Sequence, residues 1–162
     1  MSNLKRSYKT EFISLIVITL IFFFDRISKI KIINAQLQNN TVYINDFINL
    51  DLVWNTGIGF GILSTNTALF YNFITFLIFS VIIFLLYLIL KSKFIDKILY
   101  SIVVGGALGN FYDRLVYFAV PDFIDFHFQS FHWFTFNIAD IFITIGIITI
   151  IGKELIIKNE KN

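Results

Sequence analysis

The chain contains no cysteine, a single proline, two histidines and few charged side chains among its 162 residues. Without Cys it can form neither disulfides nor a thiol nucleophile, and it cannot itself be lipidated on Cys. Because His127 and His132 are the only imidazoles, we expect no ordinary zinc site, and we expect no cofactor. The net charge of +2 is too small to suggest nucleic-acid binding, and the basic residues are not clustered as a patch, so we expect no nucleic-acid partner.

Low charge and high hydrophobicity indicate a membrane protein. Charged residues make up 15% of the chain, whereas soluble domains carry about 25%. Four apolar segments, at about 12–31, 67–90, 98–118 and 136–157, each approach the roughly 20 residues that cross a bilayer as a helix. The fold class we predict is an all-α membrane protein with four transmembrane helices in one domain, 1–162.

Lys and Arg are absent from two long stretches, residues 32–90 and 115–152. They gather instead before the first apolar segment, in the link at 91–97, and after the last segment. Cytoplasmic loops carry an excess of Lys and Arg, so both termini are predicted to be cytoplasmic and the two stretches to face outside. The uninterrupted apolar run of the first segment ends at Asp25-Arg26 and no small-residue cleavage site follows, which favours a retained span over a signal peptide.

The two outer segments differ in pattern. Residues 48–54 alternate apolar and polar side chains, which predicts one or more strands in a small extracytoplasmic β-cradle at about 40–62. The second outer segment, 119–135, is rich in aromatics, as interfacial peptide tends to be. In these segments we expect a turn at Pro121. We expect Asp51 and Asp125 to be solvated loop acids, and His127 and His132 to lie at the membrane interface.

Polar side chains share helix faces inside the third apolar segment. Asn110, Asp113 and Arg114 are spaced i, i+3 and i+4. They follow Gly105 and Gly109, a small-xxx-small pair that lets another helix approach closely. These residues have two equally weighted interpretations. Asp113 and Arg114 either have a function or form a purely structural pair with Asp25 or Lys29 at the end of the first segment.

The fourth segment places Asn137 and Asp140 on one face. Asp140 precedes the next basic residue by 13 positions, which puts it roughly 20 Å from the cytoplasmic end of a helix. Asp113 and Arg114 follow Lys97 by a similar count and reach a similar depth. Asp25 lies at the outer end of the first segment, Asp122 just beyond the third, and Asn55 just beyond the predicted strand. The carboxylates and amides therefore gather near the outer membrane interface.

A purely structural role, such as an ion pair, is hardest to assign to Asp122 and Asp140, because no basic residue lies near either acid in its own segment. Two partly desolvated carboxylates do not both ionise easily, so one keeps a proton. The anion can then take a proton from water while the acid protonates the carbonyl under attack. This is aspartic-protease chemistry, and it needs no metal.

Five motifs occur in a fixed order: "DRISK", "NTGIGFGIL", "GGALGNFYDR", "VPDFIDF" and "FNIAD". Together, on a chain of this size, they resemble those of lipoprotein signal peptidase (signal peptidase II) over nearly the whole length. The resemblance implies an endopeptidase of the bacterial cytoplasmic (inner) membrane, with its site near the extracytoplasmic face. Such an enzyme removes the signal peptide of a prolipoprotein just before the diacylglyceryl-modified Cys, and its partners are the lipid-modified substrate and membrane lipids. We expect a monomer.

The resemblance also implies roles for individual residues. The catalytic dyad would be Asp122 and Asp140. Four residues would hold the substrate main chain and orient the dyad: Asn55, Asn110, Arg114 and Asn137. Asp113 would support Arg114 and the helix packing. The residues of structural support would be Asp25, Lys29, Gly57, Gly106, Gly109, Asp113 and Ala139. Two residues depart from the family pattern, Pro121 before the catalytic Asp and Gly59 where Ala is common.

Two other functions are compatible with buried acids. One is a proton- or ion-coupled transport component that uses Asp113 and Asp140 as a relay. Transporters usually show repeats and interrupted helices, and the sequence shows no repeat. The other is an inactive assembly or scaffold protein of the same fold.

Overall fold

The structure is a computed structural model that describes residues 2–36, 42–57 and 68–159. Within these ranges it contains four helices and a four-stranded antiparallel sheet. The elements follow in the order α1 (Ser2–Gln36), β1 (Val42–Asn45), β2 (Ile48–Asn55), α2 (Ala68–Lys91), α3 (Phe94–Tyr117), β3 (Val120–Phe128), β4 (Phe131–Phe136) and α4 (Ile138–Asn159).

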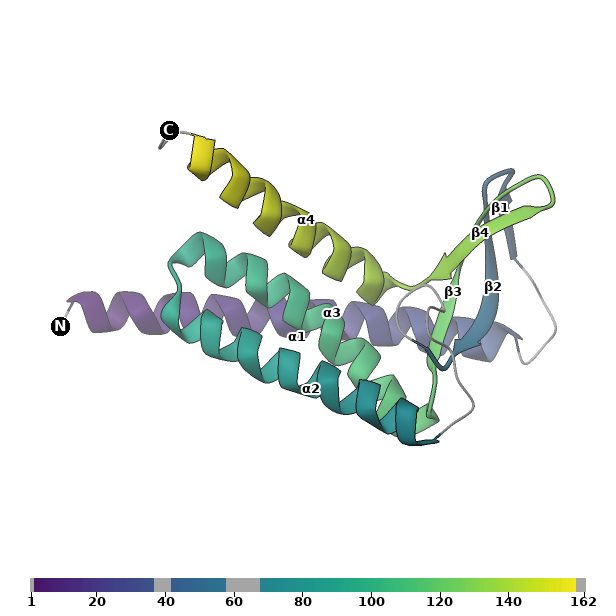
Figure 1. Ribbon diagram of the computed structural model, residues 1–162, viewed down its shortest axis with the longest axis horizontal. Coiled ribbons are helices and arrows are strands. Elements are labelled where there is room, and N and C mark those ends of the chain that lie inside the picture. Colours follow the sequence, from purple (N-terminus) through teal and green to yellow (C-terminus); the bar gives the residue numbers. More distant parts are fainter. Residues whose placement is uncertain (1, 37–41, 58–67, 160–162) are drawn as a thin grey trace.

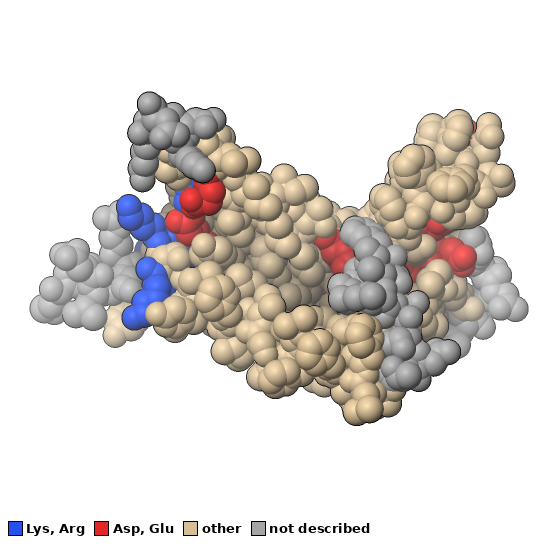
Figure 2. All heavy atoms as spheres, viewed as in Figure 1, with Lys and Arg blue, Asp and Glu red and all other residues tan. Residues whose placement is uncertain are grey.

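The helices form one elongated body and the sheet stands at one end of it (Figure 1). Both termini and the link between α2 and α3 lie at the opposite end. Helix α3 packs against α1, α2 and α4, so it is the centre of the bundle. The lysines and arginines visible in Figure 2 also gather at the end away from the sheet, and the surface between is largely uncharged in that view.

Among the described residues, α2 and α3 are long and apolar enough to cross a membrane. Only 22% of the apolar stretch of α2 and 39% of that of α3 is buried within the protein. Large apolar side chains such as Phe76 and Phe84 are instead exposed on the outer surface of α2. A helix in the core of a soluble protein would bury most of this surface, so the exposure favours a lipid environment.

The helix bounds agree with the expected segments for α2, α3 and α4, but α1 is longer than the predicted 12–31. It continues through the charged end of the segment because no Pro or Gly interrupts it. Lys29 also forms an ion pair with Asp25 at the i,i+4 spacing, and this pair is fully buried.

The sheet is larger than the sequence indicated. It has the order β1-β2-β3-β4, so the second outer segment supplies two of its strands. The expected turn at Pro121 is wrong: this residue lies in β3 and pairs with Trp54 of β2. Pro has no N–H to donate to the hydrogen-bond ladder of a sheet, and it is tolerated near the start of a strand. The sequence of β3 does not alternate clearly between apolar and polar residues, because nearly every residue of this strand is at least partly buried, on both faces of the sheet.

The expectation that Asp51 and Asp125, the acids of the two outer segments, are solvated holds only in part. Asp51 is solvent-exposed, as expected, but it lies on β2 rather than in a loop. Asp125 is buried on the central strand β3, so its assignment as a solvated acid is wrong. The remainder of the predicted cradle, including Gly59 and Phe60, lies outside the described residues.

Three glycines of α3 allow its neighbours to approach closely. A Cβ at Gly105 would lie 2.8 Å from the Cβ of Ile21 in α1. A Cβ at Gly106 would lie 2.6 Å from the backbone oxygen of Ala139 at the start of α4, and one at Gly109 would overlap the Asp25 carboxylate. Because a methyl group at any of the three would displace a neighbour, these positions require glycine.

Candidate active site

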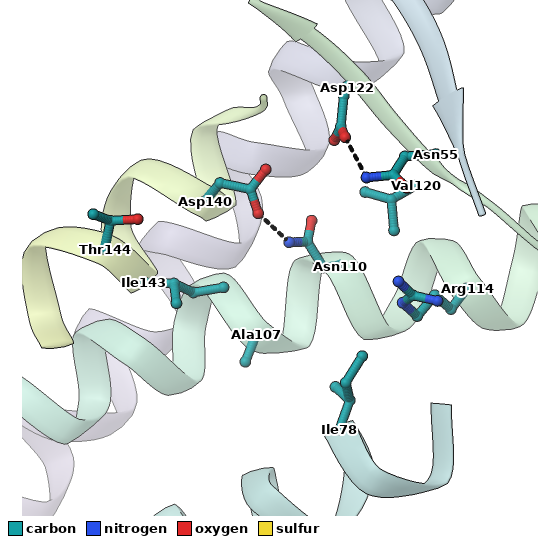
Figure 3. A pocket seen from close by; sticks show the side chains of 10 residues that line it. All are labelled: Asn55, Ile78, Ala107, Asn110, Arg114, Val120, Asp122, Asp140, Ile143 and Thr144. Atoms are coloured by element: carbon teal, nitrogen blue, oxygen red, sulfur yellow. Dashed lines mark hydrogen bonds between the residues drawn. The ribbon is translucent and has the colours of Figure 1, made fainter. Parts of the chain in front are cut away.

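Asp122 and Asp140 line the same cavity, which has a volume of about 220 Å³ (Figure 3). Asp122 comes from β3, two residues after the strand begins, and Asp140 from the first turn of α4. Both side chains are buried. The other residues that line the cavity are Asn55, Ile78, Ala107, Asn110, Arg114, Val120, Ile143 and Thr144. The structure therefore brings together two acids that lie 18 positions apart in the sequence.

Asn137 holds the start of α4 and contacts both acids. Its side-chain oxygen accepts the backbone N–H of Asp140 at 3.0 Å, and the Asp140 carboxylate accepts the backbone N–H of Asn137 at 3.2 Å. This reciprocal pair is a capping box, which satisfies two backbone donors at a helix N-terminus. The Asn137 amide nitrogen also donates to Asp122 Oδ1 at 2.6 Å. One side chain thus fixes the relative positions of the strand acid and the helix acid.

Asp122 receives a second amide from the neighbouring strand. Asn55, the last residue of β2, donates from Nδ2 to Asp122 Oδ2 at 2.8 Å. The Asn55 side-chain oxygen accepts the backbone N–H of Gly57 at 2.8 Å, which fixes the orientation of the amide group. Both oxygens of Asp122 are therefore held by amide donors.

A buried cation connects α1 to the acid on α4. Lys29 donates to Asp25 Oδ2 and to Asn110 Oδ1, each at 2.8 Å, and lies 2.7 Å from Asp113 Oδ2. Lys29 thus donates two hydrogen bonds and forms an ion pair with Asp113. Because Lys29 can only donate, the Asn110 oxygen must face it, and the Asn110 nitrogen then donates to Asp140 Oδ1 at 2.8 Å. Lys29 therefore orients the amide that holds Asp140.

Asp25 also contributes directly to α4. Its Oδ1 accepts the backbone N–H of Ala139 at 3.0 Å, while its Oδ2 contacts Lys29. The N-terminal N–H groups of a helix lack partners within the helix, and an acid is favoured there by the helix dipole. Asp25 thus ties α1 to the start of the helix that carries Asp140.

Asp113 forms ion pairs with Arg26 and Lys29 of α1, which fits the expected support of helix packing and the alternative pairing with Lys29. Arg114 instead donates to the backbone oxygen of Gly57. Arg26 was not among the predicted residues, although it lies beside Asp25 in the first motif. It is buried, and its guanidinium lies 4.6 Å from the centre of the Tyr112 ring.

Arg114 has hydrogen-bonding capacity to spare. Its Nε and Nη1 atoms are buried and have no hydrogen-bond partner among the described residues. Its guanidinium lies over the ring of Tyr71, 5.4 Å from the ring centre, and its side chain lines the cavity. Buried donors of this kind are costly unless a partner arrives, so Arg114 is suited to bind an acceptor inside the cavity.

The surroundings of Asp122 favour a proton at neutral pH. Burial raises the pKa of Asp122 and the nearby Asp140 carboxylate raises it further, to about 7, although the hydrogen bonds from Asn55 and Asn137 oppose the increase. An ordinary Asp has a pKa near 3.9 and would be fully ionised there. Asp122 can therefore gain or lose a proton under physiological conditions.

A second, apolar cavity of about 310 Å³ adjoins Asp140. It lies between β4 and α4 and is lined by Phe134, Phe136, Asp140, Ile141, Thr144 and Ile145. Asp140 and Thr144 line both cavities, so an apolar group held in the second would lie beside Asp140.

Comparison with known proteins gives consistent matches. The profile of the family described as signal peptidase (SPase) II matches residues 17–156. The lipoprotein signal peptidase of Pelagibacter ubique (strain HTCC1062) is 46% identical over 159 residues, which cover 97% of this chain and 96% of that protein. That of Anaplasma phagocytophilum (strain HZ) is 36% identical over 161 residues, 95% of this chain and 99% of that protein. A solved structure of a bacterial membrane enzyme superposes with a TM-score of 0.72 at 31% identity, covering 92% of this chain and 91% of the other.

Proposed function

Because this chain belongs to the signal peptidase II family, we propose that it removes the signal peptide from lipid-modified prolipoproteins, cutting just before the lipidated Cys. The observation that carries the proposal is the pair of buried carboxylates, Asp122 and Asp140, on one cavity and bridged by Asn137. We propose that this pair is the catalytic dyad of an aspartic endopeptidase.

The dyad would act on a water molecule held between the two carboxylates. One carboxylate, as the anion, takes a proton from the water, and the resulting hydroxide attacks the scissile carbonyl carbon. The other, as the acid, donates its proton to the carbonyl oxygen, which gives a tetrahedral intermediate. The C–N bond then breaks as the first carboxylate returns its proton to the leaving nitrogen, the second recovers a proton from the hydroxyl group, and a carboxylic acid and an amine are released. The pKa of about 7 for Asp122 supports this division, since the pair must keep one proton and lose the other.

The remaining cavity residues suit a peptide substrate. The two unused donor atoms of Arg114 can bind a main-chain carbonyl oxygen, while Asn110 and Asn137 hold Asp140 in place. The adjoining apolar cavity beside Phe134 and Phe136 can receive an apolar side chain or the start of an acyl chain. Binding energy at these positions would orient the scissile bond toward the dyad.

The surface supports a multi-pass protein of the bacterial inner membrane. The exposed apolar faces of α2 and α3 fit a lipid environment, and α1 and α4 would complete four spans. The Lys and Arg side chains visible on the surface in Figure 2 gather at the end that holds the termini, which the positive-inside rule assigns to the cytoplasm. The sheet and the dyad would then lie near the extracytoplasmic face. We propose that the single domain acts as a monomer.

The test is cleavage of a lipidated prolipoprotein, followed by mass spectrometry of the products. Asp122→Asn and Asp140→Asn should each abolish cleavage while circular dichroism shows an intact helical fold. Asp51→Asn is the matched control, because it makes the same change at an exposed acid of the same sheet. Turnover by either dyad variant would refute the proposed dyad, and cleavage at a bond other than the one before the lipidated Cys would refute the proposed specificity.

A further inference from the structure

Two imidazoles and a carboxylate meet on the pair of strands β3 and β4, and the proposed cleavage uses none of them. Asp125, His127 and His132 each offer one ligand atom, and these atoms lie within 4.8 Å of one another. Asp125 Oδ2 lies 2.7 Å from His132 Nδ1 and 3.4 Å from His127 Nδ1. Imidazole nitrogens and a carboxylate oxygen are ligands that divalent transition cations prefer.

The sheet itself brings the three side chains together. His127 and His132 are directly paired across β3 and β4, and their rings stack with centres 5.3 Å apart. Asp125 precedes His127 by two residues, so the pleat places both on one face of β3. Asp122 is three residues before Asp125 and belongs to the opposite face. The group is therefore separate from the dyad cavity, although one strand carries both.

His127 has an unmet bonding requirement. Its Nδ1 atom is buried and has no hydrogen-bond partner among the described residues. The other ring nitrogen, Nε2, is 3.5 Å from the Asn49 amide, and the backbone N–H of His127 donates to the Phe47 oxygen at 2.9 Å. Asn49 of β2 thus contacts the ring at Nε2, while Nδ1 lies on the side of the ring that faces Asp125. Buried polar atoms in native proteins nearly always have a partner, and a bound cation would provide one.

We propose that Asp125, His127 and His132 bind a divalent cation of the zinc class. Tetrahedral zinc with ligands at about 2.0–2.1 Å separates neighbouring ligand atoms by about 3.3 Å. The distance from Asp125 to His127 already matches this value, and the exposed His132 ring can adjust to it. The exposure of His132 leaves the fourth position open to water. The cation would fasten β4 to β3 and would take no part in peptide cleavage.

The proposal can be tested by metal binding to the whole protein. The protein should be purified through a tag that lacks histidine, stripped with a chelator, and titrated with Co²⁺ and then with Zn²⁺. Because the chain has no Cys and no other His, visible absorption typical of tetrahedral Co²⁺ with imidazole ligands would identify this site. We expect saturation at one equivalent and loss of the absorption when Zn²⁺ displaces Co²⁺.

Ligand variants supply the decisive comparison. His132→Asn, at the exposed ligand, should weaken Zn²⁺ binding at least tenfold, since even outer-shell changes commonly cost 10- to 100-fold. Asp125→Asn should do the same, and Asp51→Asn, an exposed acid of the same sheet, should bind as the wild type does. Zn²⁺ should raise the thermal midpoint of the wild type but not that of His132→Asn. Absence of one-equivalent binding, or unchanged affinity in His132→Asn, would overturn the proposal. Neither result bears on lipoprotein cleavage, which is measured separately.

Discussion

Replacement of Asn137 offers the sharpest test of how the site is built, because this residue makes both a structural and a functional contact. Asn137→Ala removes the side-chain cap on Asp140 N–H, which is worth about 1 kcal/mol. It also removes the hydrogen bond to the buried Asp122 carboxylate, worth about 1.5–3 kcal/mol. The free energy of unfolding should therefore fall by about 3 kcal/mol.

Asn137→Ser separates the two contributions. Serine caps helices about as well as asparagine, but its hydroxyl is too short to reach Asp122 while it caps Asp140. Asn137→Ser should therefore recover about 1 kcal/mol of the loss seen in Asn137→Ala. Cleavage should remain at least about 100-fold below wild type in both variants, because a displacement of about 1 Å at a reacting group has that effect.

The measurements are reversible unfolding in mixed detergent micelles and the rate of lipidated prolipoprotein cleavage. Asn45→Ser provides the control, since Asn45 holds an exposed turn of the sheet and should leave cleavage unchanged. Wild-type cleavage by Asn137→Ser would refute the reasoning, because it would mean that the contact with Asp122 does not position the dyad.

Three further outcomes follow from the same geometry. Asn55→Ala removes a hydrogen bond that favours the charged form of Asp122, so the pKa of Asp122 should rise above about 7 and the alkaline limb of kcat/KM should move to higher pH; an unchanged limb would contradict the assignment. Gly109→Ala should displace the Asp25 carboxylate and lower the unfolding free energy by about 1–3 kcal/mol, whereas Gly152→Ala, where an added Cβ meets nothing within 4 Å, should not destabilise the protein. Chelators should leave the cleavage rate essentially unchanged, because the dyad supplies the chemistry, and activity that is lost on chelation and restored by zinc would overturn the metal-free mechanism.

Much of the site arrangement was accessible from the sequence because helix periodicity is local. The spacing of Asn110, Asp113 and Arg114 placed them on one face of α3, and counting from basic residues placed Asp140 at the depth of Asp113 and Arg114. The capping box at Asn137 and Asp140 was also readable, since an Asn followed three residues later by an acid before an apolar run indicates a helix start.

Other features depended on long-range contacts and could not be inferred in the same way. The strand β3 lacked a clear alternation because it is covered on both faces. The partners of Arg26 depend on which helix packs against α1, since long side chains can reach acids in several directions. The burial of Asp125 depends on strand pairing, which local sequence does not specify.

The buried polar cluster has a consequence for its total charge. Among the described residues it contains four carboxylates and three cationic side chains: Asp25, Asp113, Asp122, Asp140, Arg26, Lys29 and Arg114. If every group were ionised, the cluster would carry one net negative charge in a region poorly screened by water. One proton on the pair of Asp122 and Asp140 makes the total zero, so electroneutrality favours the singly protonated pair that acid–base catalysis requires. Loss of any one cation, as in Lys29→Met, would upset this balance and favour one further proton within the cluster.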